Sequence, residues 1–312
     1  MTGEELDVTV AVITYDSADV VAGVLESLAA GGLDGVARSE VLVVDNDSTD
    51  GTPDLVRRIA PHVRVVEAGR NGGYAAGINL ARRAARPSRA LLVTNADVRF
   101  RPGSVARLLA GLDEPGVGVT VAVEVLPGDR RDDSLRRAPS IARTLCDAVL
   151  GGRRAARWGL GEAVADPAAY RQPTRAAWAS GAVHMISSRC LEETGPWDEG
   201  FFLYSEETDF DLRAHDAGYD LRLVPDAVID HECGDMSSSA ALWSLRAVNR
   251  VVLHRKRHGA VRGWIFWAAV VVQEGLRAPR SDLHRSAVRA LVRYARTGAT
   301  GAAELSGAAA PA

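Results

Sequence analysis

Two groups of acidic residues, far apart in the chain, have types and positions suited to group-transfer chemistry. Asp97 directly follows an apolar segment, 90–94, whereas Glu206 and Glu207 open a predicted helix. Ligands of α/β proteins bind at the carboxyl ends of the strands, so Asp97 is well placed to hold a metal ion against a diphosphate leaving group. A second carboxylate, apart from that metal, could take a proton from an incoming hydroxyl. The two groups together predict displacement of a diphosphate by a hydroxyl.

The elements that position Asp97 follow a repeating strand–helix pattern. Apolar, β-branched runs typical of buried parallel strands occur at 8–15, 40–44, 63–67 and 91–94. Asp16 and Ser17 predict the N-cap of a helix that runs to about Ala30, and Pro53 predicts the first turn of the next helix. A third helix is expected over 75–85. Alternating strands and helices predict an α/β fold, a Rossmann-like, mostly parallel sheet flanked by helices.

The pattern changes after the fourth strand. Periodicity weakens over 127–175, which we interpret as an insertion over the site, and apolar order resumes at 176–187. A helix is predicted from Glu206 to Ala217, closed by Gly218. Further helices are predicted near 240–257, 260–277 and 282–296. The expected domains are a catalytic domain at 1–236, with halves at about 1–125 and 126–236, a helical extension at 237–297, and a disordered tail at 298–312.

Composition limits the functional classes. The chain has 312 residues, a net charge of −3 and 47% hydrophobic residues, which argues against a nucleic-acid binder that relies on a basic surface. Cys146, Cys190 and Cys233 have neither zinc-ligand nor disulfide spacing and are expected to be reduced. The acidic N-terminus lacks a signal-peptide pattern, and the longest apolar run, 264–272, is far shorter than the ~20 residues that span a bilayer. We expect a cytoplasmic protein, with peripheral contact at the inner face of the membrane left open.

Asp45 ends the second predicted strand and opens a polar turn. Turn and capping chemistry explains Ser48, Thr49 and Asp50, but a carboxylate directly after an apolar strand is costly unless it meets a partner. We therefore predict that Asp45 accepts the ring N–H of a pyrimidine base.

Other elements are ambiguous when each is taken alone. The glycine-rich loop at 69–77 could approach phosphates, but its spacing matches neither the Walker nor the dinucleotide motif, and an ordinary loop explains it better. Asp97 alone could cap a helix, and Glu206 and Glu207 could be a solvated first helical turn. A lone histidine such as His231 is more often structural. The order of these elements is more informative than any one of them.

That order resembles the family-2 glycosyltransferases of the GT-A fold over about residues 8–236. The segments that carry the resemblance are Val12-Ile13-Thr14-Tyr15, Val44 to Thr52, Arg70 to Asn79, Asn95-Ala96-Asp97-Val98, Ser180-Gly181-Ala182, Gly195 to Tyr204, Glu206-Glu207-x-Asp209-x-x-x-Arg213 and Pro225-x-Ala227-x-x-x-His231. The chain departs from the family pattern at Asp16, where asparagine is usual, and at Glu207, where Glu-Asp is usual for the pair. Asn95 replaces the first carboxylate of the metal motif, as in the rhamnosyltransferase-like branch.

The resemblance implies an inverting, metal-dependent transfer of a sugar from a nucleotide diphosphate to an acceptor hydroxyl. It implies that Glu207 or Glu206 is the catalytic base and that Asp97, with His231 nearby, holds Mg²⁺ or Mn²⁺. The residues implied in donor binding are Thr14, Tyr15, Asp16, Asp45, Asn46, Arg70, Asn71, Gly73, Tyr74, Asn79, Asn95 and Ala96. The residues implied in acceptor binding are Gly181, Trp197, Asp198, Tyr204, Asp209 and Arg213.

The same resemblance extends to bacterial rhamnosyltransferases that act on cell-envelope lipid acceptors, which share the Asn-x-Asp motif and a stretch like 134–140. It makes dTDP-rhamnose the expected donor, with a UDP-linked sugar as the alternative, and an envelope glycan or glycolipid the expected product. Basic and aromatic residues between Arg250 and Trp267 would suit a membrane interface. A dimer interface or packing within the chain explains them at least as well.

Three rival functions remain at this point. A nucleotidyltransferase would carry a glycine-rich, basic loop after the first strand, where this chain has Asp16-Ser17-Ala18-Asp19. Loss of Asp97 or of the acidic pair would have supported a non-catalytic nucleotide-sugar-binding protein, and both are present. A glycosyltransferase of a natural-product pathway, acting on a small diffusible acceptor, is not distinguished by the sequence.

Overall fold

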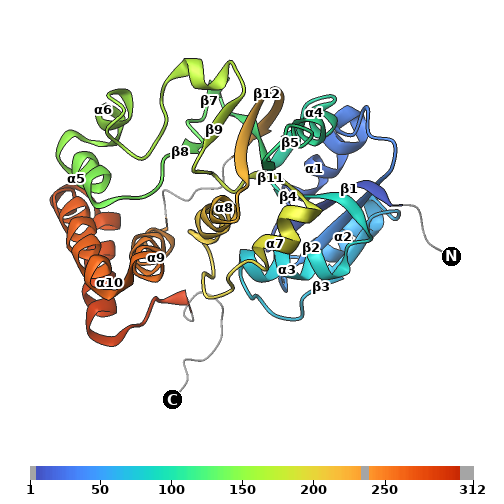
Figure 1. Cartoon of the computed structure of the whole chain (residues 1–312). Helices are drawn as coiled ribbons and strands as arrows, with labels where there is room; N and C mark the ends of the chain where they lie inside the picture. Colours follow the sequence, from blue (N-terminus) through green and yellow to red (C-terminus); the bar gives the residue numbers. More distant parts are fainter. Residues whose placement is uncertain (1–4, 233–238, 303–312) are drawn as a thin grey trace.

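The computed structural model describes residues 5–232 and 239–302 as a curled sheet flanked by helices, with a group of helices beside it (Figure 1). The strands are β1 (Leu6–Thr14), β2 (Ser39–Asp45), β3 (Arg64–Glu67), β4 (Ser88–Asn95), β5 (Val98–Phe100), β6 (Val117–Leu126), β7 (Arg130–Arg131), β8 (Leu135–Arg136), β9 (Thr174–Ala176), β10 (Trp178–Ala179), β11 (Val183–Ser187) and β12 (Asp220–His231). The α-helices are α1 (Val21–Ser27), α2 (Thr52–Ile59), α3 (Tyr74–Ala84), α4 (Ser104–Gly111), α5 (Ile141–Leu150), α6 (Gly152–Arg157), α7 (Ser188–Thr194), α8 (Glu206–Asp216), α9 (Ala240–Gly275) and α10 (Asp282–Thr297). A π-helical turn (Leu28–Gly32) and two 3₁₀ turns (Pro167–Tyr170 and Ala278–Arg280) complete the elements.

The main sheet has the strand order β3-β2-β1-β4-β11-β6-β12-β5. β1, β2, β3 and β4 are parallel, whereas β11 runs antiparallel to both β4 and β6. The chain proceeds from β1 to β2 on one side and reaches β4 on the other, which leaves a crevice at the carboxyl ends of these strands. The predicted α/β fold with a mostly parallel sheet is confirmed.

Both faces of the sheet are covered, which explains why its central strands are apolar throughout. In β1, Val8, Val10 and Val12 belong to one buried cluster, with residues of α1, α2 and α4. Ala11 and Ile13 belong to a second cluster, with residues of α3, α7 and α8. Alternate residues of a strand point to opposite faces, so a strand buried on both faces reads as one continuous apolar run.

The predicted start of the first helix was wrong. α1 begins at Val21 and has no side-chain cap. The Asp16 carboxylate instead accepts a hydrogen bond from the backbone N–H of Thr49 at 2.8 Å, and the backbone N–H of Ser17 donates to Thr52 Oγ1 at 3.0 Å. These bonds join the loops that follow β1 and β2. The Asp16 side chain does accept a hydrogen bond from a backbone N–H, as a helix cap would. That N–H belongs to the loop after β2 and not to α1.

The C-terminal helices form a separate apolar cluster. Gly259 has φ 81° and ψ 174°, so α9 is broken there into the two helices that were predicted. Phe266 in the second of these packs with Val248 in the first and with Leu291 of α10, and Ile141 of α5 packs against the same cluster. The 127–175 segment and the helical extension therefore support each other. The predicted boundary at 236/237 lies outside the described residues.

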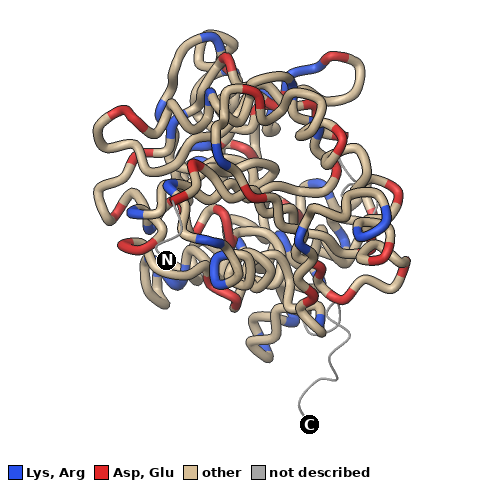
Figure 2. Tube along the Cα trace, turned by 90° about the vertical axis from the view of Figure 1, so that its right-hand side faces the viewer, with Lys and Arg blue, Asp and Glu red and all other residues tan. Residues whose placement is uncertain are grey.

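Several simpler expectations can be compared with the described part of the chain. Cys146 and Cys190 are free thiols, whereas Cys233 lies outside the described residues. No helix within 5–232 or 239–302 combines the length and apolarity needed to cross a membrane. Acidic and basic residues alternate along the Cα trace in Figure 2, in keeping with the near-neutral net charge.

Candidate active site

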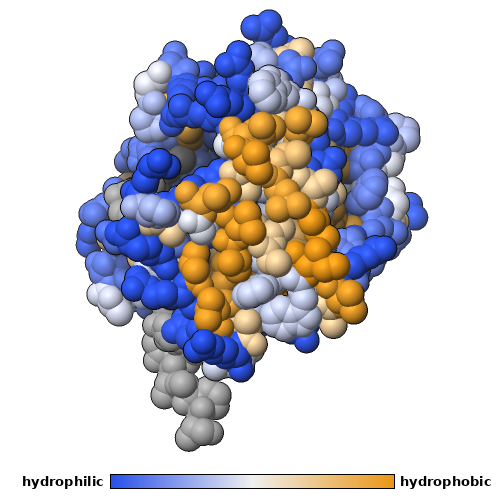
Figure 3. All heavy atoms as spheres, turned by 90° about the vertical axis from the view of Figure 1, so that its left-hand side faces the viewer, coloured by the Kyte–Doolittle hydropathy of each residue, from blue (hydrophilic) through white to orange (hydrophobic). Residues whose placement is uncertain are grey.

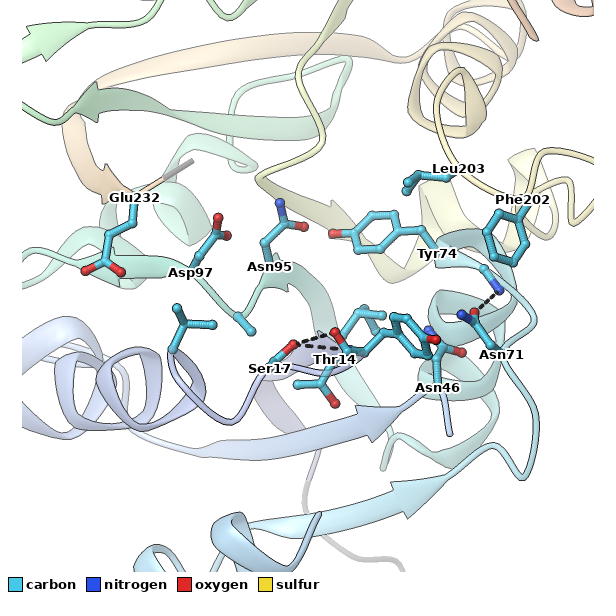
Figure 4. A pocket seen from close by; sticks show the side chains of 15 residues that line it. Thr14, Ser17, Asn46, Asn71, Tyr74, Asn95, Asp97, Phe202, Leu203 and Glu232 are labelled. Atoms are coloured by element: carbon cyan, nitrogen blue, oxygen red, sulfur yellow. Dashed lines mark hydrogen bonds between the residues drawn. The ribbon is translucent and has the colours of Figure 1, made fainter. Parts of the chain in front are cut away.

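A cavity of about 520 Å³ opens at the carboxyl ends of β1 and β4 (Figure 4). Its lining is Ile13, Thr14, Tyr15, Ser17, Val20, Asn46, Asn71, Gly73, Tyr74, Asn95, Ala96, Asp97, Phe202, Leu203 and Glu232. Most of the residues predicted to bind the donor are in this set. Asp97, Asn95 and Tyr74 lie in a row across the cavity in Figure 4. We refer to this space as the donor cavity.

Asp45 lies directly behind the lining and is buried. Its carboxylate accepts hydrogen bonds from Thr14 Oγ1 at 2.8 Å, from the backbone N–H of Ser48 at 2.8 Å and from Ser48 Oγ at 2.6 Å. These three donors supply the partner that a carboxylate after an apolar strand requires. The contact of Asp45 with a base stays a prediction, and Asn46 is the neighbour that lines the cavity.

Gly73 and Tyr74 form the wall between the donor cavity and the loop before α8. Gly73 has φ 84°, and a Cβ added there would lie 2.0 Å from the carbonyl oxygen of Phe202. Only glycine permits the chain to approach Phe202 this closely. The close approach allows the backbone N–H of Tyr74 to donate to the same carbonyl oxygen at 2.9 Å. The Tyr74 hydroxyl donates to the carbonyl of Gly181 at 3.1 Å. Burial and the carboxylates of Glu206 and Glu207 raise the pKa of Tyr74, which keeps this donor protonated.

Asp97 lies next to His231 at the edge of the donor cavity. Asp97 Oδ1 lies 3.4 Å from His231 Nε2, and the other ring nitrogen, Nδ1, lies 3.2 Å from Glu124 Oε2. Burial lowers the pKa of His231, but the hydrogen bonds with Asp97 and Glu124 outweigh it and raise the pKa to about 10. This histidine is therefore held between two carboxylates.

The donor atoms at this point fit Mg²⁺ or Mn²⁺ as a partial site. A carboxylate oxygen and an imidazole nitrogen are both ligands that Mn²⁺ accepts, and here they lie side by side. No group of three or more His, Cys, Asp or Glu side chains that could hold a metal occurs within 5–232 and 239–302. Among the described residues, Asp97 and His231 are the two that would serve as ligands, and oxygens of a bound diphosphate would add to the coordination.

The acidic pair opens α8 directly after a strained turn. Tyr204 and Ser205 have φ angles of 68° and 75°, a left-handed conformation that is unfavourable for side chains other than glycine. Asn249 of α9 holds this turn, because its side-chain amide donates to the carbonyls of Leu203 at 2.9 Å and of Tyr204 at 3.1 Å. Such a turn fixes where the first residues of the helix point.

The two glutamates of the pair differ in their surroundings. Glu206 is 3% exposed, and within the described structure its Oε2 has no hydrogen-bond partner. Burial, together with the charge of Glu207, raises the pKa of Glu206 well above its usual range. Burial also raises the pKa of Glu207, with His184 opposing the change. Glu207, unlike Glu206, lines a cavity and can meet a ligand.

That cavity, of about 230 Å³, lies between α8, α9 and the 127–175 segment. Its lining is Arg136, Pro139, Asp147, Glu162, Ala163, Trp178, Tyr204, Ser205, Glu207, Thr208, Arg246, Arg250, Leu253 and Gln273. Gly181 borders Glu207 on the side of Tyr74, since an added Cβ would lie 3.7 Å from Glu207 Cβ and 3.9 Å from the Tyr74 ring. Tyr74 and Gly181 thus lie between the two spaces. We refer to the second space as the acceptor cavity.

Some predicted site residues lie outside the linings of both cavities. The Asn79 side chain is buried and pairs with the backbone of Trp197 through bonds of 2.9 and 3.0 Å. Trp197 stacks on Phe210 of α8 with ring centroids 4.7 Å apart. Lys256 Nζ lies 2.7 Å from both Asp198 and Asp209. These contacts hold α8 in place, and a direct role of these residues in substrate binding remains untested.

Three other predicted residues also lie outside both linings: Asp16, Arg70 and Arg213. Arg213 Nε donates to Asp209 at 2.7 Å, within the same framework of α8. Asp16 belongs to the loop network described above.

Part of the basic, aromatic stretch from Arg250 to Trp267 packs within the chain. The His254 ring stacks on the buried Phe266 ring at 4.1 Å, and Trp267 Nε1 donates to the carbonyl of Leu291 at 3.0 Å. Lys256 is engaged with α8, as described. Arg255, Arg262 and Trp264 of the same stretch are exposed, so packing within the chain explains only part of it.

Sequence reasoning missed three buried polar residues near the site. Glu124 in β6 contacts His231, and His184 Nε2 lies 3.1 Å from Asp211 Oδ2 beneath α8. A single carboxylate inside the apolar run 117–126 was a signal for Glu124. Asp211 follows Glu207 by four residues, which places both on one face of α8. His184 carries no such signal, because its partner comes from a helix later in the chain.

Comparison with known proteins places these features in a family context. The sequence profile described as Glycosyl transferase family 2 matches residues 9–171, just over half of the chain. The N-acetylglucosaminyl-diphospho-decaprenol L-rhamnosyltransferase of Mycobacterium tuberculosis is 31% identical over 208 residues, which cover 61% of this chain and 66% of that protein. The succinoglycan biosynthesis protein ExoO of Rhizobium meliloti is 38% identical over 116 residues, 37% of this chain and 32% of that protein. The match thus spans less than two thirds of the length of either relative.

Solved structures show the same fold at low sequence identity. A mannosyltransferase from Pyrobaculum calidifontis, in complex with GDP-Man and Mn²⁺, superposes with a TM-score of 0.56 at 23% identity and covers 97% of this chain and 79% of its own. GalNAc-T7 with UDP, GalNAc and Mn²⁺ gives a TM-score of 0.63 at 12% identity and covers 93% of this chain and 56% of its own. These likenesses confirm the predicted GT-A fold.

Proposed function

Because this chain belongs to glycosyl transferase family 2, we propose that it transfers a sugar from a nucleotide-diphosphate donor to an acceptor hydroxyl, with inversion at the anomeric carbon. One observation carries the proposal. Asp97 lines one cavity and Glu207 lines another, and Tyr74 and Gly181 lie between the two. This arrangement suits a donor and an acceptor that approach one reacting carbon from opposite sides.

In the donor cavity, Asp97 and His231 are the residues that would hold Mg²⁺ or Mn²⁺. Bound there, the cation would offset the negative charge that grows on the diphosphate as the sugar leaves. Asn95, Asn71 and Gly73 line this cavity and would orient the donor. The nucleoside would lie toward Thr14 and Asn46, with Asp45 behind them.

In the acceptor cavity, Glu207 would take the proton of the acceptor hydroxyl. The freed oxygen forms its bond to the anomeric carbon on the face opposite the diphosphate, and the carbon–oxygen bond to the diphosphate breaks. A carboxylate with a raised pKa is a stronger base, which suits this step. Glu206, buried beside it with a raised pKa, would be held protonated and uncharged next to Glu207.

For the substrates, we propose dTDP-rhamnose as the donor and a cell-envelope glycan precursor as the acceptor. The mycobacterial relative, named as a rhamnosyltransferase, and the succinoglycan biosynthesis relative support this choice. Reaction at the cytoplasmic side of the membrane would follow, because nucleotide sugars are the proposed donors.

A donor screen tests the proposal. Thermal-shift and calorimetric titrations with dTDP- and UDP-sugars, each with and without Mn²⁺, are expected to show metal-enhanced binding of at least one donor. A matched Asp97→Asn variant should lose the enhancement by Mn²⁺ while its metal-free melting temperature stays near that of the wild type. If none of these donors binds under either condition, the proposed function is wrong.

A further inference from the structure

Two titratable side chains lie in the core beneath the acidic pair and line neither cavity. Apolar side chains on a protein surface are common, and Figure 3 shows a broad area of them on one face of the molecule. Charged groups inside a core are rare, because the loss of hydration is costly unless each group has a partner. His184 of β11 and Asp211 of α8 are such groups, with side chains 1% and 0% exposed. We call these two residues the buried pair.

The surroundings of the buried pair are largely apolar. Alternate residues of a strand share a face, and Ile186, two residues after His184, belongs to the cluster that contains Phe210 of α8. Trp197 of the same cluster meets the His184 ring edge-to-face, with centroids 6.3 Å apart. Replacement of a buried ion pair by apolar residues is often neutral or stabilising. Stability alone therefore does not account for charged groups at this place.

The Asp211 carboxylate connects α8 to two strands. Its Oδ2 lies 3.1 Å from His184 Nε2 and accepts a hydrogen bond from the backbone N–H of Ala179 in β10 at 3.2 Å. Asp211 follows Glu207 by four residues, so the two lie on one face of α8. Gly181, between β10 and β11, borders the Glu207 side chain. The chain that leads from β10 into β11 thus contacts both carboxylates of this face and fixes the position of the first turn of α8.

The charge state of His184 follows from the groups that face it. Asp211 and Glu207 act on it from α8 and Glu124 acts on it from β6, whereas Trp197, from the loop before α8, carries no charge. Burial lowers the pKa of His184, but the hydrogen bond with Asp211 and the three negative charges outweigh burial and raise the pKa. The positively charged imidazolium form of His184 is therefore favoured.

This positive charge acts in turn on Glu207. Burial raises the pKa of Glu207, and the charges of His184 and Arg246 oppose that rise. The charge of Asp211 adds to the rise, whereas Glu206, held protonated, adds no charge. A general base has to be ionised before it can take a proton. His184 thus favours the form of Glu207 that the proposed reaction uses.

We propose that His184 is a positioning residue for the base: through Asp211 it fixes the first turn of α8 against the strands, and its positive charge keeps the Glu207 carboxylate ionised. His184 lines neither cavity, so it acts through Glu207 and not on a substrate. The inference rests on the proposed function, since it assigns a role in the same reaction.

The charge of His184 can be measured without any substrate. In the full chain carrying isotope-labelled histidine, the ring-nitrogen NMR signals would be titrated with pH, and the signal of His184 is the one absent from His184→Gln. We expect this ring to stay protonated above pH ~6.5, where an unperturbed histidine is half protonated. Asp211→Asn should make it lose its proton at lower pH. A His184 ring that is already neutral at pH ~6.5 would overturn the inference.

Turnover then tests the effect on the base. The reaction is hydrolysis of dTDP-rhamnose, or of the nucleotide sugar that binds best in the donor screen, with Mg²⁺ present. Glu207 takes a proton from water, the water oxygen bonds to the anomeric carbon, and the bond from that carbon to the diphosphate breaks. In His184→Gln, kcat near pH ~6 should fall at least roughly tenfold, and kcat near pH ~9 should fall much less, because Glu207 is then ionised without help. The KM for the donor should not change.

Two further variants separate charge from packing. Asp211→Asn added to His184→Gln removes the carboxylate left unpaired beside Glu207, so it should restore part of the rate at low pH. His62→Gln, at an exposed histidine in the turn before β3, is the matched control and should keep the wild-type profile. A purely structural pair would instead lower the melting temperature and reduce kcat equally at every pH.

The outcomes separate this inference from the proposed function. An unchanged pH profile in His184→Gln, or a fall in kcat that is equal at every pH, would overturn the inference and leave the proposed function intact. A wild type that neither binds nor hydrolyses any nucleotide sugar would overturn the proposed function and this inference with it. If His184→Gln does not fold, the double variant decides, since removing both members of a buried pair is better tolerated than removing one. Its kcat should still fall more at low pH than at high pH.

Discussion

The two cavities on either side of Tyr74 differ in the side chains that line them and in the elements that carry those side chains. The donor cavity lies at strand ends, and its lining is neutral except for Asp97 and Glu232. The acceptor cavity lies between helices, and many of its lining residues are charged: Arg136, Asp147, Glu162, Glu207, Arg246 and Arg250. The shape of the donor cavity depends on backbone that the sheet positions. The shape of the acceptor cavity depends on long side chains that helix packing positions.

This difference determines how each site can change. A substitution at a strand end disturbs the sheet and its hydrogen-bonded loops, as the network around Asp45 shows. A substitution on α9 can alter a lining side chain such as Arg246 without affecting the sheet. Donor recognition should therefore be robust across relatives, and acceptor recognition should be easily altered.

The largest expected effect is the loss of turnover in Glu207→Gln, which would show that the acceptor cavity acts on kcat and the donor cavity on donor affinity. Glu207→Gln keeps the size of the side chain but cannot take a proton, so kcat should fall roughly 10²–10⁴-fold. Donor affinity should not change, because Glu207 lines only the acceptor cavity. Steady-state kinetics together with donor titration would measure both quantities.

The control for this variant is Glu206→Gln. If it abolishes turnover while Glu207→Gln does not, the base is Glu206 and the cavity assignment is wrong. Near wild-type rates for both variants would mean that the pair is only the start of a helix.

Asp97→Asn tests the donor side of the comparison. Loss of the charged ligand should weaken Mn²⁺-dependent donor binding and lower turnover, by at least the roughly 10–100-fold that follows loss of a partner to a metal ligand. Acceptor binding in the other cavity should be unaffected. Calorimetry with and without Mn²⁺ is the measurement, and equal Mn²⁺ enhancement in variant and wild type would contradict the metal role.

Asp45→Ala tests whether the strand-end network reaches the nucleoside. Removing a partner from a desolvated base should cost about 1–3 kcal/mol in affinity for UDP or dTDP. Ser48→Ala is the matched control, because it disturbs the same network but keeps the carboxylate. If Asp45→Ala binds both nucleotides as tightly as the wild type, the base site lies elsewhere.

The smallest expected effect concerns stability and pH. The folded state raises the pKa of Glu206, so its stabilising contribution is complete below the unfolded pKa and is lost as pH rises through the folded value. Glu206→Gln removes this loss, so the variant should gain in melting temperature relative to the wild type between pH 5 and pH 8. A gain of roughly 2–4 °C per kcal/mol is expected. A difference that stays constant across this range would show that the carboxyl group is not destabilised by burial.

The strands and their ends were predictable because their signals are local. Apolar runs marked β1, β2 and β4, and the polar residues directly after them line or support the donor cavity. The helix break at Gly259 was likewise marked by its glycine. Asp16 misled because its hydrogen-bond partner, Thr49, is distant in sequence, and the same local chemistry fits a helix cap.

The acceptor side was harder to predict because its residues converge only through tertiary packing. Arg136 and Arg246 come from segments more than a hundred positions apart, and nothing in either segment identifies the other. Trp197 and Asp209 were assigned to the acceptor from their place in a motif. Their burial, and the contacts of Trp197 with Phe210 and of Asp209 with Lys256, depend on how α8 packs.

The close approach of Gly73 to Phe202 has a consequence for how the binding of one substrate affects the binding of the other. One hydrogen bond, from Tyr74 N–H to the Phe202 carbonyl, belongs to the donor wall and to the chain that leads into α8. A bound donor that displaces the wall formed by Gly73 and Tyr74 would therefore also displace the chain before α8 and, with it, Glu207. Linkage makes such an effect reciprocal, so the factor by which a bound donor changes acceptor affinity equals the factor by which a bound acceptor changes donor affinity. The close approach that Gly73 permits would thus couple donor binding to acceptor binding.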